Sequence, residues 1–229
     1  MLSRRQVCNG IAGVVVVGAL AAPTVLRAAT SGARSFRIIR DGSDIGYHTV
    51  SLSRSGTEIQ AAIEIEIKVK VFGITAYRYE MSNRETWRGG QLVGLQSTVN
   101  DDGDKDFARA TMDGGQLIID GSGYQGPAPA NAATTSYWSD EFLNRPVWIS
   151  TQTGALQRVT TTRAGSGTIQ SPLGAIKTEK WAVRGDFEVD LHYAGREWAA
   201  VAFDAGGETA IYTPDAVAPA LHPVWAATT

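Results

Sequence analysis

The chain has three histidines, His48, His192 and His222, which are its side chains best suited to proton transfer or metal binding near neutral pH. Glu188, Asp190 and His192 alternate along one stretch. A strand would place these three on one face, where they could converge on a metal ion together with His48. The same pattern is typical of a solvent-facing polar row beside a hydrogen-bonded strand histidine. We favour this second interpretation, so the sequence predicts neither a metal site nor a cofactor.

Other catalytic motifs fail on residue type or spacing. A nucleophilic serine on a sharp turn needs a pattern such as Gly-x-Ser-x-Gly, which the sequence lacks. The run Asp102–Asp106 begins like a calcium loop, but Phe107 stands where the turn glycine belongs and Asp113 replaces the final glutamate. We therefore expect a charged hairpin turn there. The only cysteine is Cys8, which leaves the rest of the chain without a disulfide or a thiolate ligand.

The start of the chain is typical of an export signal. Arg4 and Arg5 precede an apolar run from Ile11 to Ala22, which is too short to span a bilayer but suits the core of a signal peptide. Ser3-Arg4-Arg5 resembles the twin-arginine motif, and ordinary secretion and a retained anchor are the alternatives. We expect residues 1–29 to be a signal recognised by the export machinery and the remaining protein to lie in the periplasm.

The net charge argues against a nucleic-acid partner. The 229 residues have 21 basic and 23 acidic side chains, a net charge of −2. Residues 1–29 contain three arginines and no acid, so without them the balance is 18 − 23 = −5. Phosphate backbones are bound by surfaces of the opposite sign.

The strands that must position the candidate site residues are indicated most clearly by one long alternating stretch, EIQAAIEIEIKVKV (58–71). Its apolar positions are Ile59, Ala61, Ile63, Ile65, Ile67, Val69 and Val71. Such alternation predicts a strand with one apolar and one charged face, and its thirteen residues from Ile59 to Val71 would extend roughly 44 Å. The following stretch, TAYRYEMSNRETW (75–87), predicts a hairpin partner. With a turn near Ile74, Lys68 would face Glu80 and Glu64 would face Arg84.

Similar patterns recur along the chain with glycine-rich turns between them. They predict strands at 36–40, 45–54, 58–71, 75–87, 92–99, 107–112, 116–120, 156–162, 167–170, 175–183, 187–193, 198–203 and 208–212. Short links favour antiparallel neighbours. Residues 121–146 break the pattern and predict a Gly/Pro-rich crossover, with Ser139 capping one helical turn over 141–144.

These features predict an all-β fold built on one long, highly curved antiparallel sheet, in the form of a half-open barrel or clam. We expect the β domain to cover residues 30–213 and an irregular tail to cover 214–229. No predicted helix is available to cover the apolar face of the sheet, so the sheet must curl over it.

Several stretches resemble a family of exported bacterial envelope proteins that has no assigned activity. The resemblance rests on Ile45-Gly46-x-His48, Glu85-x-Trp87-x-Gly89-Gly90 and Asp190-Leu191-x-Tyr193. Proteins of this kind are similar to the open β-barrels of periplasmic lipoprotein carriers, which implies a concave apolar sheet. His192 stands where the resemblance leads us to expect tryptophan, so a role for His192 would not be shared by the family.

The leading hypothesis is a periplasmic binder or carrier of an apolar small molecule or lipid in the concave face. The residues expected to contact the ligand are Ile63, Ile65, Ile67, Val69, Tyr77, Tyr79, Tyr137 and Trp138, with His48 and His192 as polar contacts. Trp138 could be a lid over the cavity or simply packed in its loop. The alternatives are a cofactor-independent enzyme with a histidine general acid or base, and an envelope scaffold without ligand.

Overall fold

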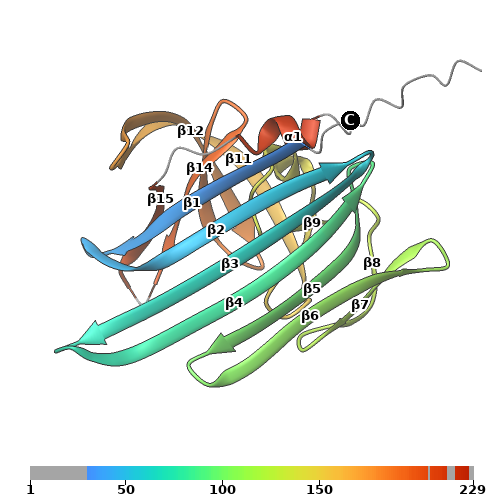
Figure 1. The fold of residues 1–229 in the computed structure, drawn as a ribbon, viewed down its shortest axis with the longest axis horizontal. Helices are drawn as coiled ribbons and strands as arrows, with labels where there is room; N and C mark the ends of the chain where they lie inside the picture. Colours follow the sequence, from blue (N-terminus) through green and yellow to red (C-terminus); the bar gives the residue numbers. More distant parts are fainter. Residues whose placement is uncertain (1–29, 206, 216–219, 227–229) are drawn as a thin grey trace, which may run out of the picture.

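The structure, a computed structural model, describes residues 30–205, 207–215 and 220–226. The export signal expected over residues 1–29 lies outside these ranges. Within them the chain is mostly β-strand (Figure 1), with one 3-10 helix and one short α-helix. Neither of these helices has the length and apolar character needed to cross a membrane.

The strands fall into an N-terminal and a C-terminal group. The first group is β1 (Thr30–Arg40), β2 (Ser43–Ser55), β3 (Glu58–Val71), β4 (Ile74–Arg88), β5 (Gln91–Asp101), β6 (Asp104–Asp113), β7 (Gln116–Gly121) and β8 (Gln125–Ala128). The second group is β9 (Ala133–Thr134), β10 (Val147–Ile149), β11 (Leu156–Ser171), β12 (Gly174–Gly185), β13 (Val189–Ala194), β14 (Glu197–Asp204) and β15 (Thr209–Pro214). The 3-10 helix η1 (Asp140–Asn144) lies between β9 and β10, and the helix α1 (His222–Ala226) follows β15.

All the described strands belong to one open sheet of 15 strands in the order β8-β7-β6-β5-β4-β3-β2-β1-β15-β14-β13-β12-β11-β10-β9. The two groups are joined where β1 pairs with β15, so the first and last strands lie in the middle of the sheet. The pairing of β9 with β10 is parallel, and the neighbouring pairs elsewhere in this order are antiparallel. The predicted all-β, open and strongly curved sheet is confirmed.

The sheet curls until its flanks approach each other. Figure 1 shows β1–β8 as a broad twisted layer in front of the C-terminal strands. Just after β7 in the sequence, the Gly123 amide donates a 2.7 Å hydrogen bond to the Thr153 carbonyl in the loop before β11. A Cβ atom at Gly121 would lie 2.3 Å from the same carbonyl oxygen, so only glycine permits this approach.

The predicted long hairpin is formed by β3 and β4, but its register differs from the prediction. Phe72 and Gly73 form the turn, so the chain reverses before Ile74 and the predicted register is wrong by two residues. The observed pairs are Lys68 with Arg78, Glu66 with Glu80 and Glu64 with Ser82. The expected pairs, Lys68 with Glu80 and Glu64 with Arg84, are not formed. The alternation itself does not depend on where the turn falls, so the apolar and charged faces remain as predicted.

This register places like charges opposite each other on the outer face. Each of these charged side chains instead forms an ion pair with an oppositely charged residue of its own strand. Lys68 forms an ion pair with Glu66, and Arg78 forms one with Glu80. The hydrogen bonds from these basic groups hold the pKa of the two carboxyl groups below its ordinary value. Exposed pairs of this kind add little to stability, but they keep the outer face hydrated.

The crossover contains more regular structure than its composition predicts. Ser139 caps the expected helical turn by accepting a hydrogen bond from the Glu141 amide, and η1 follows it. The strands β8 and β9 also lie within the segment, and β10 begins just after it. These short strands were missed because each has only two to four residues and none shows a period of two.

The crossover fills one half of the concave face with aromatic rings. Trp138 and Phe142 pack against Trp87 of β4 and Trp225 of α1, with ring centroids 5.0–6.0 Å apart. The carboxylate of Glu85 lies at this cluster, and its side chain has no exposed surface. It accepts hydrogen bonds from the Trp87 indole at 2.8 Å, the Trp138 indole at 3.1 Å and the Asn83 amide at 2.9 Å.

The tail expected to be irregular over 214–229 includes the helix α1 within its described part. Val224 and Trp225 of this helix are buried against the core, although Pro and Ala dominate the local sequence. A five-residue helix has little stability of its own, so tertiary packing is what holds it in place.

The unequal coverage of the apolar face leads to a stability prediction for two isoleucines. Ile63 on β3 is fully buried, whereas Ile74 at the start of β4 is 74% exposed. We expect Ile63→Ala to lower the free energy of unfolding by about 2–5 kcal/mol, because a cavity is left in the core. Ile74→Ala should cost less than about 0.5 kcal/mol. Urea denaturation measures both losses, and similar values would contradict the unequal coverage of the apolar face.

Candidate functional site

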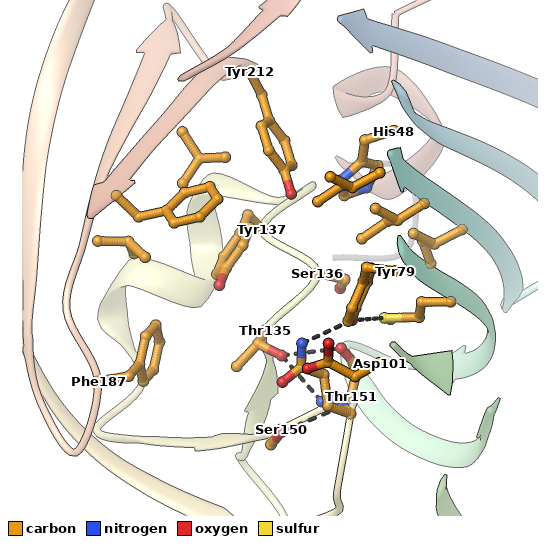
Figure 2. Close-up of a pocket in the computed structure, with 18 of the residues that line it drawn as sticks. His48, Tyr79, Asp101, Thr135, Ser136, Tyr137, Ser150, Thr151, Phe187 and Tyr212 are labelled. Carbon is orange, nitrogen blue, oxygen red and sulfur yellow. Dashed lines mark hydrogen bonds between the residues drawn. The ribbon is translucent and has the colours of Figure 1, made fainter. Parts of the chain in front are cut away.

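The other half of the concave face is a pocket of about 400 Å³. It lies between β2–β4 on one side and β13–β15 on the other, with the crossover and the loop after β10 along its wall. Figure 2 shows His48, Tyr79, Tyr137 and Tyr212 around this space. Its lining residues are His48, Ile63, Ile65, Ile67, Tyr77, Tyr79, Met81, Asp101, Thr135, Ser136, Tyr137, Ser150, Thr151, Gln152, Gln157, Phe187, Glu188, Val189, Val201, Phe203, Asp204 and Tyr212.

The pocket has a closed end and a mouth. Along β3, Ile63 is fully buried, Ile65 and Ile67 are half-buried, and Val71 beyond the pocket is 51% exposed. The exposed Asp101 and Asp204 are the last residues of their strands, at the same end of the sheet as the β3–β4 turn. Hairpin geometry therefore places the mouth of the pocket at this end of the sheet and Ile63 at the closed end of the pocket.

The tyrosines provide uncharged hydroxyl groups. Burial raises the pKa of Tyr79 to about 12, and its hydroxyl accepts a 2.7 Å hydrogen bond from the Gln152 side chain. Burial also raises the pKa of Tyr137 and Tyr212, and burial together with a hydrogen bond to Asp101 raises that of Tyr77. All four stay protonated at neutral pH, so none is poised to act as a base there.

Tyr137 is held in the pocket by a strained turn. Its φ is 61°, in the left-handed region that non-glycine residues rarely adopt. The Tyr193 hydroxyl donates a 2.7 Å hydrogen bond to the Tyr137 carbonyl and also contacts the Ser139 carbonyl at 3.2 Å. This clamp lets consecutive side chains take opposite roles: Tyr137 lines the pocket while Trp138 enters the core.

The polar wall beside Tyr137 is internally satisfied. The Thr135 hydroxyl lies 3.0 Å from the Thr151 hydroxyl and accepts a hydrogen bond from the Thr151 amide at the same distance. The Ser136 hydroxyl lies 2.6 Å from that of Thr134. Because these groups bond to one another, they form a fixed wall rather than a set of free ligand-binding groups.

His48 is the exception. It is 2% exposed, and neither ring nitrogen has a hydrogen-bond partner among the described residues. Its neighbours are the rings of Phe36, Trp198 and Tyr212, with centroids 5.9, 5.2 and 5.4 Å away. Burial without a compensating charge lowers the pKa of His48 to about 3, so the imidazole is neutral.

The charges of the pocket have one sign. Asp101, Glu188 and Asp204 lie at its exposed mouth, and no lysine or arginine is present among the described lining residues. A negatively charged ligand would meet repulsion at the mouth and no counter-charge inside.

Most of the predicted ligand contacts are brought together in the pocket. Ile63, Ile65, Ile67, Tyr77, Tyr79, Tyr137 and His48 line it. Val69 lies in a separate surface depression beside Lys68 and Lys70. Trp138 is 1% exposed within the aromatic cluster, so the structure places it in the core and not over the cavity. The loop-packing alternative describes its position.

His192 lies away from the pocket. Its Nδ1 atom is 3.1 Å from the Thr178 hydroxyl, and burial together with the Lys180 charge lowers its pKa. Asp190 forms ion pairs of 2.6 Å with Lys180 and 2.7 Å with Arg184. The described residues contain no group of three His, Cys, Asp or Glu side chains able to hold a metal ion.

Several lining residues escaped prediction from sequence. Val201, Phe203 and Tyr212 come from β14 and β15, and Phe187 comes from the link between β12 and β13. Thr135, Ser136 and Gln152 come from the crossover and the loop after β10. The run of apolar residues in β14 (198–203) predicts burial but does not show which side chains face the pocket. No local signal indicates that these residues share a pocket with Ile63–Ile67.

The buried neutral histidine predicts an acid dependence of stability. The pKa of His48 is near 6.5 in the unfolded chain and about 3 in the folded protein. As the pH is lowered below 6.5, His48 of the unfolded chain takes up a proton while His48 of the folded protein stays neutral. The free energy of unfolding therefore decreases as the pH is lowered. Between pH 6.5 and 5 the loss due to His48 should be roughly 1.5 kcal/mol.

Chemical denaturation at several pH values tests this expectation by comparing wild type with His48→Phe. The variant keeps His192 and every carboxylate, so the difference between the two proteins isolates His48. The stability of the wild type relative to the variant should fall by roughly 1.5 kcal/mol as the pH falls from 6.5 to 5, because only the wild type loses stability through this residue. Parallel pH profiles would contradict a neutral, buried His48.

Comparison with known proteins adds a family but no activity. No curated protein and no solved structure shows significant similarity to this chain. The family model described as a domain of unknown function, DUF6134, matches residues 36–215, which include the hairpin, the crossover and every residue of the pocket. Because this match covers most of the chain, the protein belongs to the DUF6134 family.

Proposed function

We propose that this protein binds or carries an apolar small molecule or lipid in the pocket, and that it does so in the periplasm. The observation that carries the proposal is the division of the concave face. Aromatic rings fill one half, and the other half holds a pocket of about 400 Å³ with apolar and aromatic walls. Concave, mostly apolar pockets with a few polar groups are the usual form of small-molecule sites.

The charge of the pocket narrows the ligand class. The described lining residues carry carboxylates at the mouth and no basic side chain, so the ligand is not an anion. The likeness to the open β-barrels of periplasmic lipoprotein carriers is part of the same proposal, because such sheets also present an apolar concave face. Fold likeness alone does not decide function.

The two alternatives have less support. An enzyme of this kind would use His48 or His192 as its general acid or base. His192 is bonded to Thr178 outside the pocket, and burial lowers the pKa of His48 to about 3, which makes it a weak base. A scaffold without ligand would be expected to fill its interior, whereas here an apolar cavity remains. Ligand binding accounts for that cavity without a further assumption.

A cavity-filling variant tests the binding proposal. Ile67 lines the pocket and is half-buried, while Val71 lies on the same face of β3 beyond the pocket. We expect Ile67→Trp to weaken uptake of a hydrophobic fluorescent probe at least about tenfold, because the indole occupies the probe's volume. Val71→Trp is the matched control and should leave uptake unchanged. Equal uptake by both variants would place the probe elsewhere on the protein.

Native mass spectrometry offers an independent readout. Protein purified under mild conditions should carry lipophilic molecules, and the amount bound should fall in Ile67→Trp. A wild-type protein that carries nothing and takes up no probe would favour the scaffold alternative.

The periplasmic location has its own test. The two arginines of the proposed twin-arginine signal are Arg4 and Arg5. Replacing both by lysine should keep the protein in the cytoplasm, since twin-arginine export depends on the arginine pair. Cell fractionation followed by immunoblotting measures the outcome. Normal export of the double variant would assign the protein to the general secretory route instead.

A further inference from the structure

His48 has hydrogen-bonding capacity that the protein does not use. It is the one described lining residue with fully buried side-chain nitrogens that lack a partner. Leaving a buried donor or acceptor unpaired is unfavourable, so such groups usually meet a ligand or an ordered molecule. The other buried polar side chains of the wall have partners: the Ser136 hydroxyl lies 2.6 Å from that of Thr134, and the Thr151 hydroxyl lies 3.0 Å from that of Thr135.

The imidazole lies on the apolar side of the pocket and away from the mouth. His48 is opposite Ile65 in the β2–β3 register and one step along the face from Val50, which is fully buried. Figure 2 shows its ring beside Tyr212, facing the space bounded by Tyr79 and Tyr137. A ligand must enter past Asp101 and Asp204 before it reaches this ring.

The surroundings determine which polar group can meet His48. The aromatic neighbours Phe36 and Trp198 provide no counter-charge, and burial lowers the pKa of His48 to about 3. The neutral ring offers one N–H donor and one nitrogen acceptor. A hydroxyl group can both donate and accept, so it fits either tautomer. An anionic headgroup would meet only the carboxylates of the mouth on its way in.

We propose that the pocket selects an uncharged amphiphile whose apolar body lies against Ile63–Ile67 and the tyrosine rings, while a single hydroxyl group forms a hydrogen bond with His48. This inference rests on the proposed binding function and names the class of its ligand. His48 thereby acts as the specificity-determining residue of the site.

Three probes of similar size test the inference: naphthalene, 2-naphthol and 2-naphthoate. Dissociation constants at neutral pH come from calorimetry or from displacement of the fluorescent probe. For wild type we expect 2-naphthol to bind roughly fivefold to tenfold more tightly than naphthalene, the gain from one buried hydrogen bond. 2-Naphthoate should bind most weakly, because it carries a negative charge.

Variants assign the preference to one residue. In His48→Phe the ratio of the two dissociation constants should approach one, so the preference for 2-naphthol over naphthalene should disappear. His48→Gln, which keeps a donor and an acceptor, should retain part of the preference. His192→Phe is the matched control outside the pocket and should change nothing.

The outcomes separate this inference from the function on which it rests. Failure of wild type to bind any of the three probes would contradict the binding function itself. Binding of naphthalene and 2-naphthol with equal affinity, or tightest binding of 2-naphthoate, would overturn the role of His48 and leave apolar binding intact. Persistence of the preference in His48→Phe would do the same. If His48→Phe does not fold, the wild-type series and His48→Gln still decide between these outcomes.

Discussion

The buried carboxylate of Glu85 is the constraint on which the rest of the structure depends. A carboxylate with no exposed surface is tolerated only when its oxygens are hydrogen-bonded, and here Trp87, Trp138 and Asn83 supply the donors. Trp138 comes from the crossover, 53 residues along the chain. The need to satisfy Glu85 therefore ties the crossover down onto β4. Arg145 adds a second tie by donating to the Gly90 carbonyl at 2.8 Å.

The same interaction divides the concave face into a filled half and an open half. With Trp138 in place, Phe142 and Trp225 complete a close-packed cluster over one end of the long hairpin. The crossover then turns sharply at Tyr137, whose left-handed backbone directs its ring into the other half. One segment thus closes the core and forms a wall of the pocket, so core stability and pocket shape are coupled through neighbouring residues.

The pocket combines apolar walls with uncharged polar groups. Burial keeps its tyrosines protonated and its histidine neutral, and the carboxylates remain at the solvated mouth. Removing a charge from water is far more costly than removing a hydrogen-bonded hydroxyl, which explains why the charged lining side chains stay at the rim. This distribution of polar and apolar groups supports the proposal that the site holds a molecule by shape and contact area.

The sequence by itself determined the strands, their apolar and charged faces, and six of the eight apolar and aromatic residues expected at the pocket. Alternation with a period of two is a local property of the backbone, so it can be read without knowledge of partners. The hairpin register depends on where the turn falls, and the short strands of the crossover depend on pairing that no local period indicates. The helix α1 depends on packing against the core. The tertiary structure alone decided that Trp138 enters the core through Glu85, and that Phe203 and Tyr212 line the same pocket as Ile63–Ile67. Coverage of a sheet face depends on how the whole sheet curves, because the chain that covers a residue can lie anywhere else in the sequence.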